Sequence, residues 1–225
     1  MAFSKIVLIF SVIVVVVSSC SQKDEGVIEY KITYEQSKEE NPLVNLMPTQ
    51  MNFFFTEDMI LTQIEGWMGI FKSHQLSSLQ DSTNILLMKL LDKKYYFKRK
   101  LSEAPLGFEK VDILKLEYLE KDTLYKGYKC KKVLANVMID SMRRQFCFLY
   151  TNDIKVNSPN RNNPFSQIPG VLMKFNMSFR GIAMQLDFKD YRDTTFTEST
   201  FAIPTDYQEL SREEMTEFFT KISTL

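Results

Sequence analysis

Side chains suited to catalysis or metal binding are scarce in this 225-residue chain, which has one histidine and three cysteines. One histidine cannot assemble a multi-histidine metal site. The sequence contains no H-E-x-x-H, G-x-S-x-G or glycine-rich phosphate-binding motif. His74 could serve as a base for Ser73, but no third group nearby would orient its ring. Paired carboxylates leave no short signature, so a carboxylate hydrolase stays open. We nevertheless expect no catalytic residue, no metal and no cofactor.

The first cysteine follows an N-terminal export signal. Lys5 supplies a positive charge, and residues 6–17 are apolar apart from Ser11, a run too short for a membrane-spanning helix of about 20 residues. The run ends in Val17-Ser18-Ser19-Cys20, which resembles a bacterial lipoprotein signal. We therefore expect residues 1–19 to be removed and Cys20 to be acylated. An ordinary signal peptide or an N-terminal membrane anchor is the alternative.

Residues 20–26 would form the acylated cysteine and a short tether. Ser21 to Glu25 resembles, one position late, the lysine-then-acidic tags that send some Gram-negative lipoproteins to the outer face of the outer membrane. A plain solvated linker is the alternative. We expect an outer-membrane lipoprotein on the periplasmic or cell-surface face, held there by its acyl chains.

Residues 27–225 are long enough for one domain with its own core and short of a comfortable pair. The 28 basic and 28 acidic residues balance, so no broad electrostatic field would attract nucleic acid or anionic lipid. We expect no nucleic-acid partner.

Apolar residues at every second position predict strands through most of this domain. Residues 66–81 have no readable pattern, and Ser211 with Glu214 predicts a capped C-terminal helix. The expected strands are Val27–Glu35, Met51–Phe55 with Met59–Ile64, Asn84–Leu91 with Lys94–Lys100 (Leu90 opposite Tyr95), Val111–Glu120, and Thr194–Phe201.

Two further hairpins have a testable register. Residues 127–138 and 144–151, with a turn at 140–141, would place Ala135 opposite Phe146 and Val133 opposite Phe148. Val171–Phe179 and Ile182–Phe188, joined by a two-residue turn, would pair residues 179 with 182, 177 with 184 and 175 with 186. Both registers gather the apolar side chains on one face.

The first of these registers separates Cys130 from Cys147. Leu134 lies opposite Cys147, an offset of about 13 Å at 3.3 Å per residue, whereas a disulfide needs Cα atoms within about 7 Å. We expect two free, half-buried thiols. A slipped or bulged hairpin would be the route to a bond.

The methionines and phenylalanines suggest a ligand site. On one face of the sheet these side chains would form an apolar lining, which the flexible methionine side chains would make adaptable to different ligands. The candidate residues are Met173, Phe175, Met177, Met184, Leu186 and Phe188. The alternative is a core filled by the C-terminal helix, whose apolar stripe is Met215, Phe218, Phe219 and Ile222.

Two other features have two interpretations each. Residues 157–167 carry Phe165 among polar residues and could be a lid, a docking loop or a simple connection. A basic zone on the central hairpin could bind acidic partners or be a solvated face. It consists of Lys129, Lys131, Lys132, Arg143 and Arg144.

The chain resembles two related families of small envelope proteins, the uncharacterised DUF4412 family and the GLPGLI family. The matching segments are Val27-Ile28-Glu29-Tyr30-Lys31-Ile32-Thr33-Tyr34, Gly127-Tyr128-Lys129-Cys130-Lys131-Lys132, Tyr150-Thr151-Asn152-Asp153-Ile154-Lys155-Val156, Pro164-Phe165, and Phe201-Ala202-Ile203-Pro204 with Tyr207. Ile168-Pro169-Gly170-Val171-Leu172 stands where the second family has Leu-Pro-Gly-Leu-Ile. Its first residue and the missing preceding glycine depart from that pattern, which favours the first family.

The resemblance implies a fold like that of the LolA and LolB lipoprotein carriers and brings no catalytic residues. The expected fold is mainly β within the α+β class. It is a strongly curved antiparallel sheet or half-open barrel, with a C-terminal helix and one or more short helices packed on it. The expected function is non-catalytic binding of a lipid, another apolar molecule or an envelope protein in that half-barrel. The alternative is a structural or protein-interaction lipoprotein whose own helix fills the cavity.

Overall fold

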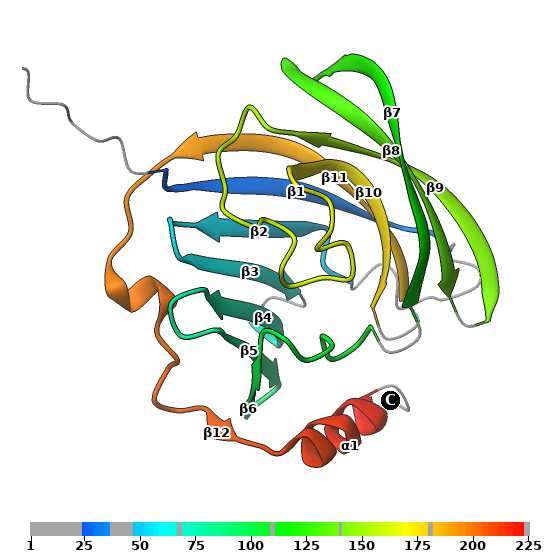
Figure 1. Ribbon diagram of the computed structural model, residues 1–225. Helices are drawn as coiled ribbons and strands as arrows, with labels where there is room; N and C mark the ends of the chain where they lie inside the picture. Colours follow the sequence, from blue (N-terminus) through cyan, green and yellow to red (C-terminus); the bar gives the residue numbers. More distant parts are fainter. Residues whose placement is uncertain are drawn as a thin grey trace, which may run out of the picture.

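The computed structural model describes residues 24–36, 47–66, 69–108, 111–139, 141–179 and 182–222. Within these ranges the chain forms one strongly curved, unclosed sheet of twelve strands with a C-terminal helix (Figure 1). The strand order is β12-β6-β5-β4-β3-β2-β1-β11-β10-β9-β8-β7. Neighbours are antiparallel except β12 and β6, which are parallel. The fold class expected from the sequence is confirmed.

The elements have the following bounds. They are β1 (Gly26–Tyr34), β2 (Gln50–Phe55), β3 (Met59–Gly66), β4 (Phe71–Ser78), β5 (Thr83–Leu90), β6 (Lys93–Lys100), β7 (Val111–Tyr125), β8 (Tyr128–Ile139), β9 (Met142–Thr151), β10 (Val171–Phe179), β11 (Ile182–Asp193), the 3-10 helix η3 (Glu198–Phe201), β12 (Gln208–Glu209) and α1 (Arg212–Ile222). The expected signal, Cys20 and turn residues 140 and 180–181 lie outside the described residues.

Both hairpin registers predicted from the apolar pattern are confirmed. In β8–β9, Val133 pairs with Phe148 and Ala135 with Phe146. In β10–β11 the three expected pairs form, residues 175 with 186, 177 with 184 and 179 with 182. A register error of one residue would have moved every apolar side chain to the wrong face, so the pattern specified the pairing strongly.

The β5–β6 hairpin forms, but its predicted register is wrong by two residues. Tyr95 pairs with Met88 instead of Leu90, and Leu90 pairs with Lys93. The turn is therefore Leu91-Asp92, and Leu91 adopts a positive φ of 58°. An even shift keeps each side chain on its face, so the apolar pattern could not distinguish the two registers.

Two assignments near these strands are corrected. Thr194–Phe201 is not a strand, because residues 194–197 are irregular and η3 follows. Phe201 of this segment, together with Ile203 and Tyr207 that follow it, packs instead against a buried cluster on the outer face of β3–β6. β4 was missed because one of its faces is mostly polar, with Ser73, Gln75 and Ser77.

The C-terminal helix begins at the predicted cap. Glu214 donates its backbone N–H to Ser211 Oγ over 3.2 Å, and Ser211 donates its own to Glu214 Oε2 over 2.8 Å. Met215 and Phe219 are buried against β5, β6 and Leu106 at one end of the sheet (Figure 1). The helix therefore covers the β5–β6 end of the sheet and meets the β10–β11 hairpin at its tip, where the ring of Phe219 stands edge-on to that of Phe179 with centroids 6.2 Å apart. No helix among the described residues has the length and apolar character needed to span a membrane.

Candidate functional site

The six side chains predicted to line an apolar cavity lie together on the inner face of the curved sheet, but they are largely covered. Met173 and Leu186 are fully buried, and the exposed fractions of the next three are 3–5%. Those three are Phe175, Met184 and Phe188. Met177 is half-buried. The inner face at this point is a packed core.

β1 contributes an aromatic centre to this core. The ring of Tyr30 stands edge-on to Phe175 and Phe188, with centroids 6.0 and 6.5 Å apart. Its hydroxyl donates to the backbone oxygen of Leu172 over 2.9 Å, which satisfies the polar atom inside the core. Burial raises the pKa of Tyr30 above its usual value, so the phenol stays neutral.

The cover over this core is the loop between β9 and β10, residues 152–170, which we call the plug loop. In Figure 1 it crosses in front of β1 to β3. Ile154, Phe165 and Ile168 are at most 4% exposed and belong to the same cluster as the six lining residues. The ring of Phe165 packs edge-on against Phe148, with centroids 4.8 Å apart. The plug loop therefore fills the trough over these residues, and neither an open ligand site nor the alternative of a core filled by the C-terminal helix describes it.

Hydrogen bonds within the plug loop hold its shape without helix or strand. Asn160 is buried, and its side-chain amide donates to the backbone oxygens of Ile168 and Gly170 over 2.8 and 2.9 Å. Asn163 Oδ1 accepts the backbone N–H of Phe165 over 2.8 Å. A Cβ at Gly170 would lie 2.4 Å from the backbone oxygen of Thr151, so only glycine fits where the loop rejoins the sheet.

A polar seam joins the plug loop to the inner face of β4 and β5. Arg161 Nε donates to Ser77 Oγ over 2.6 Å, and Asn84 Nδ2 donates to Asn162 Oδ1 over 2.7 Å. Burial lowers the pKa of Arg161 to about 10, although Asp58 nearby opposes this. The polar inner face of β4, which is why the sequence pattern did not predict this strand, is the surface against which the plug loop packs.

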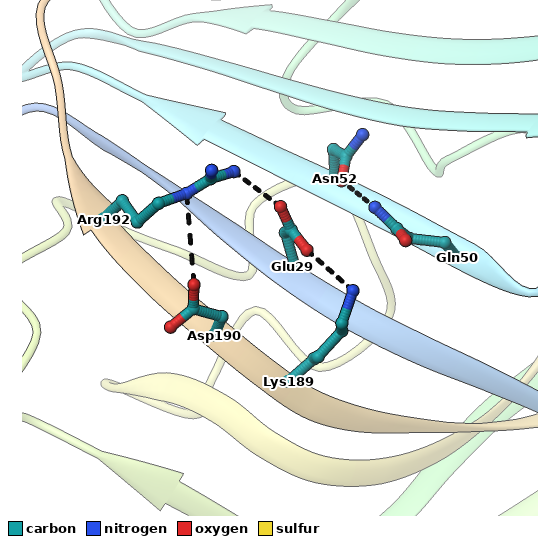
Figure 2. A network of polar contacts seen from close by, with 6 residues as sticks. All are labelled: Glu29, Gln50, Asn52, Lys189, Asp190 and Arg192. Atoms are coloured by element: carbon teal, nitrogen blue, oxygen red, sulfur yellow. Dashed lines mark hydrogen bonds and ion pairs between the residues drawn. The ribbon is translucent and has the colours of Figure 1, made fainter.

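The outer face of β1, β2 and β11 carries a polar network instead (Figure 2). Glu29 accepts from Arg192 Nη2 over 2.5 Å and from Lys189 Nζ over 3.1 Å. Lys189 is the extra residue of a β-bulge, because Glu29 pairs with Asp190 and the next residue of β1 pairs with Phe188. These contacts support the pairing of β1 with β11 on the solvent-facing side of the sheet.

His74 and Ser73 point to opposite faces of β4, so they cannot form a base–nucleophile pair. His74 pairs with Leu87 on the outer face, and Ser73 pairs with Met88 on the inner face. An orienting carboxylate that the sequence did not reveal is present, since Glu65 Oε1 lies 2.8 Å from His74 Nε2. Burial lowers the pKa of His74 despite this contact. Glu65 could be found only once β4 was known to pair with β3.

The two described cysteines are free, as predicted, but not half-buried. Cys130 is fully buried and Cys147 is exposed. In the β8–β9 register Cys130 lies opposite Thr151 and Cys147 lies opposite Leu134, so the two cysteines are offset along the strands as predicted. Burial raises the pKa of the Cys130 thiol to about 11.

The basic zone is a partly paired surface. Lys129, Lys131 and Arg143 are exposed. Lys129 lies 2.9 Å from Asp122, and Arg144 lies 3.0 Å from Glu35.

Two cavities border the sheet away from the filled trough. One of about 260 Å³ lies where β9 and β10 separate, and Met177 lines it. A wider opening of about 720 Å³ is lined by residues 81–83 and 98–103. Arg99, in its wall, has one buried nitrogen without a hydrogen-bond partner among the described residues.

No family model matches the chain. No curated protein matches it. Among solved structures it is similar to that of PNGF-II in space group C2, with a TM-score of 0.54 and 11% identity over 86% of this chain and 32% of that one. At this identity the likeness shows the fold alone. The chain spans about a third of the length of PNGF-II.

Proposed function

We propose that this chain is a non-catalytic, lipid-anchored protein of the bacterial envelope that acts through its surface as a protein-interaction platform. The observation that carries the proposal is the plug loop, which occupies the trough with Ile154, Phe165 and Ile168. The lipoprotein-like signal ending at Cys20 and the resemblance to the DUF4412 and GLPGLI families support the envelope location.

Energetics favour this role over that of a lipid carrier. A ligand that took the trough would first expose three buried apolar side chains, each worth about 1.5–3 kcal/mol of burial. The ligand would have to offset roughly 5–9 kcal/mol before it bound at all. Ligand binding is the second candidate because Met177 reaches the cavity of about 260 Å³.

Two further observations support the proposal, the first its non-catalytic part and the second its interaction part. Ser73 and His74 are held on opposite sides of one strand, which separates the best nucleophile from the best base. In PNGF-II a similar fold is about a third of a longer chain, which suits a unit that works beside other proteins or domains.

The test uses the full chain produced in a Gram-negative envelope. We expect radiolabelled palmitate to enter the wild type and not Cys20→Ala. Denaturing extraction and mass spectrometry of the purified protein should yield no apolar molecule in stoichiometric amount. An unlabelled wild type would reject the anchor, and one retained lipid per protein would reject the filled trough in favour of a carrier.

A further inference from the structure

The sheet is split between β9 and β10. These strands pair only from Val171 with Thr151 to Lys174 with Leu149, and the register is irregular between them. Beyond this point β10 continues to Phe179 and is paired with β11 only. β9 extends back to Met142 and is paired with β8 only. Among the described strands, none pairs with the facing edges of residues 142–148 and 175–179. Unpaired edges expose backbone donors and acceptors that another strand can satisfy.

The cavity of about 260 Å³ lies in this split. Its apolar wall is Ile139, Met142, Phe146 and Met177. Met142 is 55% exposed, so the cavity is open to solvent. The volume exceeds that of a single large side chain, and two of the wall residues are methionines that adapt to varied shapes.

Glu35 spans the mouth of the split. Its Oε2 accepts from Arg144 Nη1 of β9 over 3.0 Å, and its Oε1 accepts from Asn176 Nδ2 of β10 over 3.3 Å. Both contacts are exposed, so each is worth at most about 1 kcal/mol. An incoming segment could exchange them for its own contacts at little cost.

Positive charge dominates the outer rim of the split. Lys132 and Arg143 lie on the same face as the exposed Cys147, and Lys174 lies on that face of β10. Two positive charges have acidic neighbours, since Lys174 lies opposite Asp187 of β11 and Arg144 is paired with Glu35, so Lys132 and Arg143 are the surplus among the described residues. Charge complementarity therefore favours an acidic occupant.

We propose that the split between β9 and β10 is the docking site for an extended, acidic segment of a partner protein. The segment adds backbone hydrogen bonds to the strand edges that no described strand pairs, and it places one apolar side chain in the cavity. This inference rests on the proposed interaction role and gives it a place on the molecule.

The probe is a labelled peptide, acetyl-Asp-Thr-Val-Thr-Leu-Thr-Val-Asp-amide, added to the full chain in detergent micelles. We expect saturable fluorescence anisotropy and slower amide exchange in residues 142–148 and 175–179. A peptide with proline in place of the central leucine should not bind, because it loses a donor and the apolar side chain. Lysines in place of the aspartates should weaken binding at least fivefold.

Ala183→Phe fills the cavity from β11, since Ala183 lines it. We expect at least tenfold weaker binding. Gln185→Phe, two residues along on the same face and outside the cavity lining, is the matched control and should bind within twofold of the wild type. Met142→Glu at the exposed mouth should repel the acidic peptide without disturbing the fold, and thermal unfolding checks that all variants remain folded.

Equal binding by Ala183→Phe and wild type would overturn the site. Slow exchange of the split amides before any peptide is added would also overturn it, because the edges would already be paired. Peptide binding at the split without any partner in the envelope would reject the interaction role and keep the site. If an envelope partner bound the wild type and Ala183→Phe equally well, the interaction role would stand and the split would be rejected as its site.

Discussion

The ring of Phe165 stands edge-on to that of Phe148, with centroids 4.8 Å apart and an interplanar angle of 81°. One ring belongs to the plug loop and the other to the inner face of β9, and both are at most 2% exposed. This contact joins an irregular loop to the centre of the core. The loop is therefore a structural part of the domain as well as a connection.

Phe165→Ala should destabilise the protein strongly. Removal of a buried aromatic ring leaves a cavity that the surroundings fill only in part, which costs about 3–5 kcal/mol. Chemical denaturation monitored by circular dichroism measures the loss. Gln167→Ala, at an exposed position in the same loop, should stay within about 0.5 kcal/mol of the wild type. A loss below about 1 kcal/mol for Phe165→Ala would mean that the plug loop does not fill the trough.

Asn84 and Asn162 should show coupling across the polar seam. Asn84→Ala leaves the buried Oδ1 of Asn162 without its donor, beside a Nδ2 already unpartnered, at a cost of about 1–3 kcal/mol. The double variant with Asn162→Ala should cost less than the two single losses together, by about 0.5–1.5 kcal/mol. Denaturation of all four proteins gives the cycle, and strictly additive losses would contradict the contact.

Ser211→Ala should loosen α1 by about 1 kcal/mol, because the cap loses its acceptor for the Glu214 N–H. Ser211→Asp keeps an acceptor at the same place and should restore the stability. Hydrogen exchange in residues 212–222 is the local measurement. Equal exchange in wild type and Ser211→Ala would show that packing of Met215 and Phe219 alone holds the helix.

The buried Cys130 thiol should make stability depend on alkaline pH. Its pKa rises from 9.0 to about 11 on folding because of burial, with a smaller contribution from Asp153. The unfolded chain then loses this proton at lower pH than the folded one. The thiol's contribution is full below pH 9 and is lost as pH rises towards 11. Cys130→Ala should therefore show a shallower fall in unfolding free energy between pH 9 and about 11, and identical slopes would contradict the assignment.

The two hairpin registers that were predicted correctly are specified by features close together in the sequence. Strands β10 and β11 are joined by two residues, so turn length and alternation together specify which side chains face each other. The β5–β6 hairpin shows the limit, since two registers two residues apart satisfy the same alternation. β4 shows a second limit of prediction. Its inner face is polar, and Ser77 on that face accepts a hydrogen bond from Arg161, a residue far along the chain.

The sequence by itself determined most of the antiparallel strands, the two best hairpins, the capped helix and the apolar character of the six trough residues. These follow from alternation, turn length and capping, which act over a few neighbouring residues. Tertiary structure alone decided what covers the trough and where the sheet splits. The plug loop has no periodicity, and its contacts, such as Asn84 with Asn162, join residues 78 positions apart. Only the folded chain brings such residues together, so no local pattern could reveal them.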